Sequence, residues 1–448
     1  MKILFINPNP YILNKRYLKM PTFFKNLYFS YPTVCPPLVF PILSSITPKK
    51  YNIDFIEDGY NKINFELKYD LVAITSNTVQ STRAYQIADK FRKKKIPVII
   101  GGCHATACPK EVKLHADAVV IGEVEEIWSS ILKDLEENKL KPFYKQKKPT
   151  NLNNLPKPDM TILNGPLWIK YNQFYITQAS RGCKNNCKFC FIGNSINNKF
   201  RTRPIKDIID EIKTVKQKII LFYDPSITSD QDYFIDLCDS LKKTNKKFIF
   251  EGNSNILANN DVLLKISKEA GCINWVIGFE SVSQRTLNNM NKTNKVSEYY
   301  DLIKKIHDLN MNIHGLFMFG FDSDDINVFS DTLNFLKKAK IDSVEFSILT
   351  PLPGTPFYDK LKSDNRIIKD DWSKFGYDDV VFELLNFTER EFVDMMISFY
   401  NEYYSIFQIR DRIIANLKRG FRFDVSTFIA DNLIKGYINK YKMLNYEF

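Results

Sequence analysis

Short apolar segments alternate with amphipathic, helix-like stretches through most of this chain. The apolar segments are nearly continuous in Val, Ile, Leu and Phe, which is typical of strands buried on both faces. Strands of this kind, joined by helical crossovers, form parallel sheets covered by helices. A chain of 448 residues is too long for one such core, because a domain takes roughly 150 residues. The sequence therefore predicts two or three domains, at least two of them α/β.

The first series of segments predicts a doubly wound domain over residues 1–140. Its expected strands are residues 2–6, 52–58, 70–75, 97–102 and 116–122. Ligands of such sheets bind at the carboxyl ends of the strands. Loops rich in glycine, hydroxyl and amide groups follow three of the strands, at residues 76–80, 101–106 and 122–126. We therefore expect this domain to bind a ligand.

A second series predicts an incomplete barrel over residues 173–365. Residues 141–172 separate the two series; they are rich in Lys, Pro and Asn, have no period and are predicted to be a linker. The expected barrel strands are residues 174–179, 218–224, 247–252, 273–281, 312–320 and 342–349. Six βα units fall short of the eight of a closed barrel, so we expect a partial (β/α)6 barrel of the TIM type, active at the C-terminal ends of its strands.

The remaining residues, 366–448, are predicted to be a helical extension with many aromatic residues. Thr388 and Glu391 form a capping-box pattern that predicts the start of a helix. Two to four helices should pack on the barrel. The basic, aromatic tail from Arg410 to Phe448 is compatible with contact at a membrane surface or with a hydrophobic substrate.

The composition excludes several classes of protein. A chain that is 44% hydrophobic and 14% aromatic is neither disordered nor fibrous. No apolar stretch approaches the roughly 18 residues that span a bilayer, and the first apolar run is too short for a secretion signal. We therefore expect a cytoplasmic protein. The formal charge of +12 comes without a dense basic run or an aromatic platform, so no nucleic-acid partner is expected.

Three of the eight cysteines lie close together in RGCKNNCKFC, after the first expected barrel strand: Cys183, Cys187 and Cys190. Structural zinc sites take four ligands, and four-iron clusters usually take four thiolates. Three thiols in one loop can bind three irons and leave the fourth iron open, whereas a zinc site with a distant fourth ligand is the alternative. The other cysteines are expected to be small buried hydrophobic residues: Cys35, Cys103, Cys108, Cys238 and Cys272.

The cysteine spacing, with Phe189 before the last cysteine, resembles the motif of the radical S-adenosylmethionine (SAM) superfamily. Four stretches at strand ends resemble its SAM-binding elements: DPSIT from residue 224, residues 253–255, GFES (278–281) and TPLPGTPFYDKL (350–361). The resemblance implies that the three cysteines bind a [4Fe-4S] cluster, whose open iron binds SAM. It implies that further residues contact the cofactors: Phe189, Asp224, Pro225, Asn253, Asn255, Glu280, Ser281, Pro353 and Gly354.

The first domain resembles the cobalamin-binding domain found before many radical SAM barrels, which has a flavodoxin-like fold. The resemblance lies in residues 36–46, 74–84, 101–112 and 116–128, and it extends to DWSKF (371–375) and VVFELLNFTEREF (380–392). It implies cobalamin contacts from the loops at the strand ends: Ser76, Asn77, Thr78, Gln80, Gly101, Gly102, His104, Gly122 and Glu123. Where many cobalamin domains present a histidine to cobalt, this chain has IEDGYNKI (56–63). We therefore expect cobalamin without a histidine lower ligand.

The four histidines give little further indication of catalysis. His104 follows two glycines and is expected at a loop or at the cofactor's edge. His115, His307 and His314 are expected to be ordinary helix or strand residues, because none has a second histidine or a clustered carboxylate in the sequence.

Together the two resemblances imply an enzyme that cleaves SAM reductively to a 5′-deoxyadenosyl radical and uses cobalamin for C-methylation of an unactivated carbon. An alternative is a cobalamin-dependent cyclisation, rearrangement or oxidation without methyl transfer. A methylthiotransferase is less favoured, because Cys35, Cys103 and Cys108 do not follow three successive strands. The alternative from another class is a non-catalytic metal or cofactor sensor. The expected partners are a reductase, flavodoxin or ferredoxin as electron donor and a small-molecule, lipid or peptide substrate.

Overall fold

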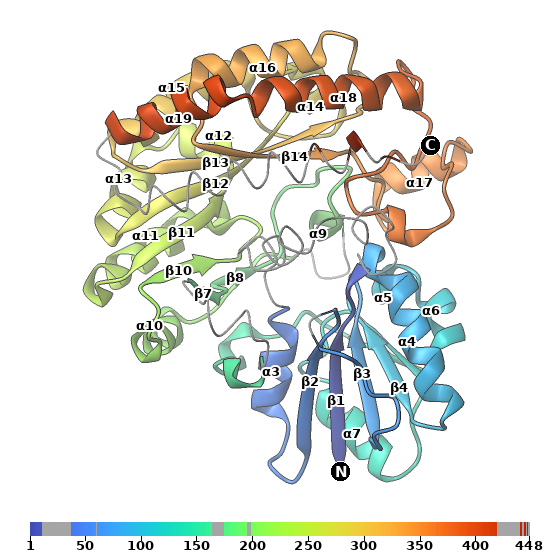
Figure 1. Cartoon of the computed structure of the whole chain (residues 1–448). Helices are drawn as coiled ribbons and strands as arrows, with labels where there is room; N and C mark the ends of the chain where they lie inside the picture. Colours follow the sequence, from blue (N-terminus) through green and yellow to red (C-terminus); the bar gives the residue numbers. More distant parts are fainter. Residues whose placement is uncertain are drawn as a thin grey trace.

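The computed structural model describes residues 1–10, 37–59, 61–163, 174–194 and 199–418, together with residues 440, 443, 444 and 446. Two six-stranded parallel sheets form the two halves of this described part (Figure 1). Predictions that concern Cys35, Pro36, Tyr60, the end of the expected linker and most of the tail after residue 418 lie outside the described residues.

The first sheet confirms the predicted doubly wound domain. Its strands are β1 (Lys2–Asn7), β2 (Asn52–Glu57), β3 (Leu71–Thr75), β4 (Val98–Gly101), β5 (Ala118–Ile121) and β6 (Phe143–Lys145). They lie in the order β2-β1-β3-β4-β5-β6, and every pair is parallel. The order reverses between β1 and β3, and a ligand crevice is expected at such a switch point. β6 lies within the segment predicted to be a linker, where three residues are too few to give a period.

Helices cover both faces of the first sheet. α3 (Val39–Ile46) and α7 (Trp128–Glu136) pack on one face, where Trp128 is 1% exposed. α4 (Ser81–Lys93), α5 (Cys103–Ala107) and α6 (Pro109–His115) pack on the other face. The sheet is therefore buried on both sides, as its continuous apolar strands predicted.

The second sheet confirms the partial barrel. Its strands are β7 (Phe174–Thr177), β10 (Ile219–Phe222), β11 (Lys247–Gly252), β12 (Cys272–Glu280), β13 (Asn312–Phe319) and β14 (Ser343–Ile348). They lie in chain order and are all parallel, and β7 and β14 are the two edges. The crossover helices are α10 (Ile205–Thr214), α11 (Gln231–Leu241), α12 (Ser254–Ala258), α13 (Asp261–Ala270), α14 (Gln284–Asn289), α15 (Tyr299–Asp308) and α16 (Val328–Ala339).

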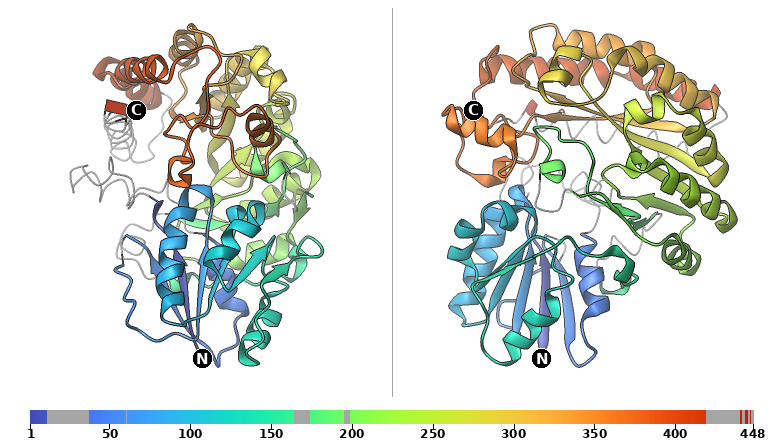
Figure 2. Two further views of the ribbon diagram at one scale, coloured as in Figure 1. Left: turned by 90° about the vertical axis from the view of Figure 1, so that its right-hand side faces the viewer. Right: turned by 180° about the vertical axis from the view of Figure 1, so that it is seen from behind.

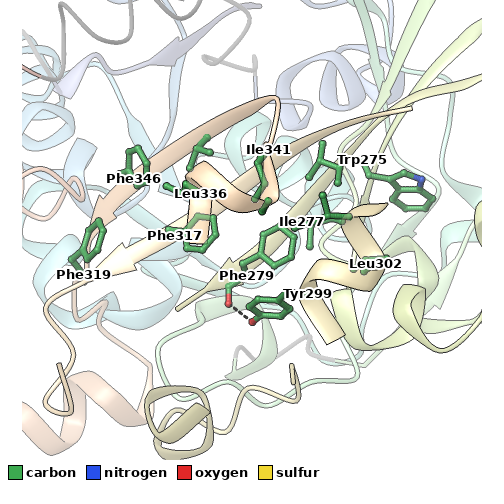
Figure 3. Packing of buried hydrophobic residues seen from close by; sticks show 14 of the residues in the cluster. Trp275, Ile277, Phe279, Tyr299, Leu302, Phe317, Phe319, Leu336, Ile341 and Phe346 are labelled. Carbon is green, nitrogen blue, oxygen red and sulfur yellow. Dashed lines mark hydrogen bonds between the residues drawn. The ribbon is translucent and has the colours of Figure 1, made fainter. Parts of the chain in front are cut away.

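Aromatic side chains fill the layer between this sheet and its helices (Figure 3). The rings of Phe279 and Phe317, on neighbouring strands, stack at 5.5 Å. Tyr299 on α15 packs edge-on against Phe279 and donates its hydroxyl proton to the Phe279 carbonyl oxygen at 2.9 Å. Because alternate strand residues enter this layer, the intervening residues lie on the opposite, concave face of the sheet.

The C-terminal region crosses from the barrel to the first domain and back. Residues 366–388 are largely without helix, apart from a short 3-10 turn at Trp372–Lys374. The predicted capping box is confirmed, because Thr388 Oγ1 accepts the backbone N–H of Glu391 at the start of α18 (Glu389–Tyr403). α18 packs on α16, and α19 (Ile406–Lys418) follows it (Figure 1).

A small ribbon carries the expected cluster loop between the two halves. β8 (Ser180–Arg181) pairs antiparallel with β9 (Arg201–Thr202), and α9 (Phe191–Asn194) lies in the connection between them. Figure 1 shows α9 between the first domain and the curved second sheet, and the right-hand view of Figure 2 shows the same arrangement from behind. The loops at the carboxyl ends of both sheets therefore face this connection.

Glu57, at the carboxyl end of β2, is a buried acid with an altered pKa. Burial raises the pKa of Glu57 to about 8; a hydrogen bond from the Asn7 amide at 2.7 Å opposes this shift, and the charge of Asp58 adds to it. Between pH 4.5 and about 8 the unfolded chain has released this proton, whereas the folded chain retains it. The folded state therefore loses stability as pH rises through this window, by up to about 1.4 kcal/mol per pH unit.

We predict that Glu57→Gln removes this part of the pH dependence, because the amide cannot ionise. The free energy of unfolding of both proteins is measured by denaturant titration from about pH 5 to about pH 8. The value for the variant minus the value for the unaltered chain should increase as pH rises. Glu66→Gln is the matched control, because the Glu66 side chain is 82% exposed. Parallel curves for the Glu57 variant and the unaltered chain would contradict the prediction.

Candidate active site

Hydrogen bonds from three neighbouring segments fix the backbone of the cysteine loop. The side-chain amide of Asn194 donates to the carbonyl oxygens of Cys187 and Cys190, each at 2.8 Å. The N–H of Lys188 donates to the carbonyl of Met290 at 3.0 Å, just after α14. The carbonyl of Lys188 in turn accepts the N–H of Phe357 at 3.1 Å, at the start of α17 (Pro356–Ser363).

The number of thiols in the loop is compatible with an iron–sulfur cluster. Cys183, Cys187 and Cys190 are all free thiols in the structure. A structural zinc ion takes four protein ligands, and a four-iron cluster is usually held by four thiolates. Three thiolates can bind three irons of such a cluster and leave the fourth iron open.

The thiols lie in a buried environment beside one cation. Burial raises the pKa of the Cys187 thiol to about 11, and the ammonium of Lys292 opposes the shift. Burial also raises the pKa of Cys183, against a hydrogen bond from the Asn185 N–H. Because metal ligands are thiolates, binding a cluster here would release protons.

Glu280, a predicted SAM contact, forms a buried ion pair with Lys292 at 2.8 Å. Its φ angle of +67° is unusual for a residue with a side chain, and the register between β12 and β13 shifts at this point. This geometry turns the carboxylate toward Lys292. Sequence reasoning missed Lys292, because it lies in the polar run NKTNK (291–295), which has no period and resembles an exposed loop.

Asp224, predicted at the SAM site, lies fully buried at the carboxyl end of β10. Its carboxylate accepts the N–H of Ala179 at 3.0 Å and both the N–H and the hydroxyl of Ser180. Burial raises the pKa of Asp224 to about 6, although these hydrogen bonds oppose the shift. The carboxylate thus joins the end of β10 to the start of the cysteine loop. Pro225, another predicted SAM contact, follows Asp224 in the loop after β10.

The other predicted SAM residues lie at successive strand ends, as the sequence indicated. Asn253 follows β11 and donates to the Ser226 hydroxyl at 2.6 Å. Ser281 follows β12, and its hydroxyl accepts the N–H of Ser283 at 3.1 Å. Both predicted residues are almost fully buried. The side-chain oxygen of Asn255, by contrast, is buried without a hydrogen-bond partner.

The loop at Pro353 and Gly354 lies between the cysteine loop and the first domain. Gly354 has a φ of +83°, and a Cβ there would lie 3.3 Å from Ala107 and 3.4 Å from the Phe191 ring. Ala107 ends α5 in the first domain, and Phe191 directly follows Cys190. Phe189 packs against the barrel core near Phe321, at 6.4 Å between ring centroids. Glycine at 354 therefore permits a three-way contact beside the thiols.

The loops of the first domain that were predicted to hold cobalamin lie together at one edge of its sheet. Gln80 donates to Asn7 Oδ1 and to the Pro8 carbonyl, which links the loop after β3 to the end of β1. Gly102 has a φ of +103°, and a Cβ there would lie 2.5 Å from the Ser76 carbonyl. The predicted residues brought to this edge are Ser76, Asn77, Thr78, Gln80, Gly101, Gly102 and Gly122.

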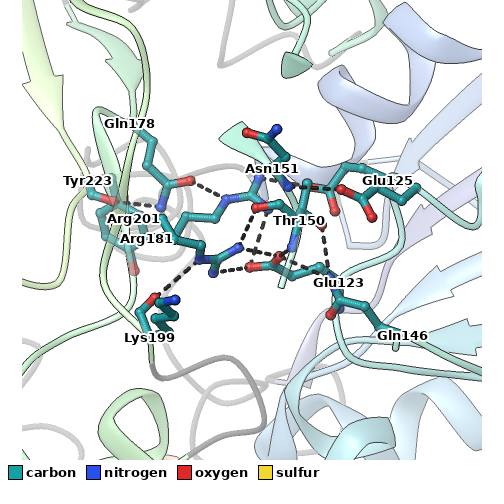
Figure 4. A network of polar contacts seen from close by, with 11 residues as sticks. Glu123, Glu125, Gln146, Thr150, Asn151, Gln178, Arg181, Lys199, Arg201 and Tyr223 are labelled. Carbon is teal, nitrogen blue, oxygen red and sulfur yellow. Dashed lines mark hydrogen bonds and ion pairs between the residues drawn. The ribbon is translucent and has the colours of Figure 1, made fainter. Parts of the chain in front are cut away.

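Glu123, another predicted cobalamin contact, forms an ion pair across the domain boundary (Figure 4). Its two carboxylate oxygens accept from Arg201 at 2.7 and 2.8 Å. Arg181, which lies two residues before Cys183, is 3.6 Å from Glu123 and 2.7 Å from Glu125. Burial raises the pKa of Glu123, but the Arg201 hydrogen bond and the two arginine charges outweigh it and lower the pKa to about 2. The first domain is therefore ion-paired to the ribbon that carries the cysteines.

Each of the four histidines contacts a hydroxyl or a carboxylate of a neighbouring side chain. His104 is fully buried, with Nε2 3.0 Å from the Tyr85 hydroxyl. His115 stacks on Tyr85, and His307 contacts Asp342 at 3.0 Å. His314 lies on the concave face of the second sheet, where Nδ1 is 2.7 Å from the Ser343 hydroxyl.

The loop that replaces the cobalt-binding histidine motif is closed by an ion pair. Asp58 accepts from Arg83 at 2.8 and 3.1 Å, and it also accepts the N–H of Asn9. Gly59 follows with a φ of +95°. The Asp58 carboxylate of IEDG therefore forms an ion pair with Arg83 on α4. The described residues of this loop include no histidine.

Tyr377 is a residue that sequence reasoning missed at the junction of the domains. Its φ is +68°, its side chain is 43% exposed, and its carbonyl accepts the N–H of Ile348 at the end of β14 at 2.8 Å. Its phenol lies within electrostatic range of Cys190 and Cys103. No periodic pattern identifies such a residue, because the strain arises from tertiary contacts.

None of the helices in the described part of the chain is long and apolar enough to cross a bilayer. This finding agrees with the absence of an apolar run of spanning length in the sequence.

Comparison with known proteins agrees with both resemblances. The sequence matches the Radical SAM superfamily over residues 177–336 and the B12 binding domain over residues 57–132. It is 29% identical to a bacteriochlorophyllide d C-12(1)-methyltransferase of Chlorobaculum tepidum, over 83% of each chain. It is also 29% identical to the C-8(2)-methyltransferase of that organism, over 84% of this chain and 87% of that protein.

A solved structure agrees with the whole fold. The cobalamin-dependent SAM radical enzyme OxsB, with aqua-cobalamin and SAM bound, superposes with a TM-score of 0.69 at 15% identity, over 96% of this chain and 74% of that chain. The two family matches, the six-stranded partial barrel and the doubly wound first domain lead to one conclusion. This chain is a radical SAM protein with an N-terminal B12-binding domain.

Proposed function

We propose that this protein is a cobalamin-dependent radical SAM methyltransferase that methylates an unactivated carbon. The observation that carries the proposal is the position of the three-thiol loop, which contacts the cobalamin-type domain on one side and lies at the carboxyl ends of the barrel strands on the other. The names of the two Chlorobaculum relatives support methyl transfer as the reaction. A reductase, flavodoxin or ferredoxin would supply the electron.

Cys183, Cys187 and Cys190 would hold the cluster, and no fourth side chain is required, so one iron stays open to SAM. When bound, the cluster supplies the electron that cleaves SAM, and cobalamin supplies the methyl group. The chain's own residues orient these groups and limit access of water. Asn194 and Lys188 keep the loop in one conformation, and the Glu280–Lys292 pair places a cation beside Cys187.

The first domain would hold cobalamin with the polar loops at its sheet edge. His104 is buried toward Tyr85, and Asp58 is occupied by Arg83. These contacts support the proposal that cobalt takes no histidine lower ligand from these positions. The Glu123–Arg201 contact would then fix the distance between the cobalamin edge and the cysteine loop.

We predict that Cys187→Ala abolishes reductive cleavage of SAM, because two thiols cannot retain the cluster. Anaerobic reconstitution should give less than the full iron content, and 5′-deoxyadenosine formation should fall to the level of the reaction without enzyme. Cys272→Ala is the matched control, because Cys272 is also a buried cysteine but lies at the start of β12, whereas the predicted SAM contact Glu280 lies at its end. Cleavage that survived in the Cys187 variant, or tightly bound zinc in the unaltered chain's loop, would contradict the radical reaction.

Methyl transfer is tested by incubating the reconstituted enzyme with methyl-deuterated SAM, a reductant and cell extract. Methylation predicts a product that gains one methyl group carrying three deuterium atoms. A cyclisation or oxidation would consume SAM without incorporating the label. Such a result would contradict methyl transfer and leave the radical reaction itself intact.

We further predict that Glu123→Gln uncouples SAM cleavage from methylation. Removing the charge weakens the pairing with Arg201 and Arg181 and lets the two domains shift, and a misplacement of about 1 Å can cost about 100-fold in rate. The amount of 5′-deoxyadenosine released per methylated product should rise at least about tenfold. Glu126→Gln is the control from the same loop, since Glu126 accepts the N–H of Asn151. An unchanged ratio in the Glu123 variant would exclude a positioning role.

A further inference from the structure

The outer side of the cysteine loop is exposed and basic. Lys184 directly follows Cys183, and Lys188 directly follows Cys187. Both lysines are exposed, whereas Cys187 is 6% exposed. The loop therefore directs two positive charges to solvent, each of them one residue along the chain from a proposed cluster ligand.

The helix α14 and the turn after it extend this side of the loop. The side-chain amide of Asn291 donates to the carbonyl of Asn186 at 3.0 Å. The ammonium group of Lys188 donates to the carbonyl of Asn289 at 2.8 Å. Arg285 lies one helical turn before Asn289 on α14, and both residues are exposed. The outer side of the cysteine loop and the exposed side of α14 therefore form one continuous surface.

Neither of the two segments that form this surface contains a carboxylate. Residues 182–200 and 284–295 have no Asp or Glu and carry six basic residues: Lys184, Lys188, Lys199, Arg285, Lys292 and Lys295. Lys292 is paired with Glu280. Lys295 is paired with Glu298 at 3.2 Å. Lys184, Lys188 and Arg285, by contrast, form no ion pair with any residue that the structure describes. These three residues are called the basic surface below.

The basic surface is suited to a macromolecular partner of opposite charge. A surface of one sign attracts a partner of the other sign and speeds their association. The formal charge of +12 adds attraction at longer range. The predicted SAM contacts Asn253 and Ser281 are 9% and 3% exposed, so they are far less accessible than the basic surface. A partner can therefore reach the basic surface without entering the barrel.

We propose that Lys184, Lys188 and Arg285 form the docking surface for an acidic one-electron donor protein of the flavodoxin or ferredoxin type. The inference rests on the proposed function, because it requires a cluster on the neighbouring cysteines. One electron passes from the donor to the cluster, so the donor is oxidised by one electron and the cluster is reduced by one electron. Electron-transfer partners meet through small, weak interfaces, so three unpaired cations beside the thiols are sufficient.

Cross-linking locates the contact without an activity measurement. The reconstituted full-length protein is mixed anaerobically with a purified acidic flavodoxin and a carbodiimide, which joins lysine amines to carboxylates in contact. Mass spectrometry then identifies the joined residues. Lys184 or Lys188 should be joined to flavodoxin at about 10 mM salt, and the yield should fall at about 100 mM salt, where the charges are screened. A product that involves neither lysine, or no product at all, would overturn the proposal.

A charge reversal tests the same surface in the reaction. Lys184→Glu and Arg285→Glu are combined in one chain, and 5′-deoxyadenosine formation is measured with reduced flavodoxin and, separately, with titanium(III) citrate. The half-saturating flavodoxin concentration should rise at least about tenfold at low salt, whereas the rate with titanium(III) should be unchanged. Lys243→Glu with Lys265→Glu is the matched control, because these lysines are exposed in the turn after α11 and on α13. The control should respond to flavodoxin as the unaltered chain does.

Titanium(III) also separates this inference from the proposed function. If the unaltered chain forms no 5′-deoxyadenosine even with titanium(III), the proposed function fails and the inference fails with it. If titanium(III) supports the reaction but neither an acidic flavodoxin nor an acidic ferredoxin does, only the docking proposal is overturned. An unchanged flavodoxin requirement in the charge-reversed variant has the same meaning. A variant that also loses the titanium(III) reaction is misfolded, and the cross-link positions in the unaltered chain then decide the question.

Discussion

The carboxylate of Glu123 and the guanidinium groups of Arg201 and Arg181 hold the two halves of this protein in one relative orientation. Both oxygens of Glu123 are used, and the three side chains are 13–16% exposed. Burying such charges costs desolvation free energy that their attraction only partly returns, so the net stabilisation is small. The cost of breaking the contact is large, because one charge would stay buried without its partner. The network therefore specifies orientation more than it stabilises the fold.

This orientation matters because the cysteine loop lies at the contact between the halves. Arg181 lies two residues before Cys183, and Gly354 lies so close to Ala107 of the first domain and to Phe191 after Cys190 that a Cβ at this position would contact both. A shift of the first domain would therefore move groups that directly flank the thiols. The same contacts place the end of α5, the helix that follows Gly102, beside the loop at Gly354.

The sequence predicted the architecture well, since each predicted feature depended on a local period. The continuous apolar strands, the six barrel units and the capping box at Thr388 are confirmed. β6 was missed because three residues carry no period. The sequence placed the site residues at strand ends, but it did not predict their hydrogen-bond and ion-pair partners, because these partners depend on the tertiary structure. Asp224 bonds Ser180, 44 positions away, and Glu123 bonds Arg201, 78 positions away. His104 likewise turned inward toward Tyr85.

Tyr377 shows what such tertiary constraints can impose on one residue. A left-handed backbone costs an aromatic residue roughly 1–3 kcal/mol, so neighbouring contacts must enforce it. On one side the carbonyl of Tyr377 accepts the N–H of Ile348, and on the other a Cβ on Gly376 would lie 2.9 Å from Val79 in the first domain. The chain is thus held at both ends of this strained unit, by the barrel and by the first domain. The backbone at residue 377 is thereby fixed by both halves of the protein, and a change in the domain contact would be transmitted directly to it.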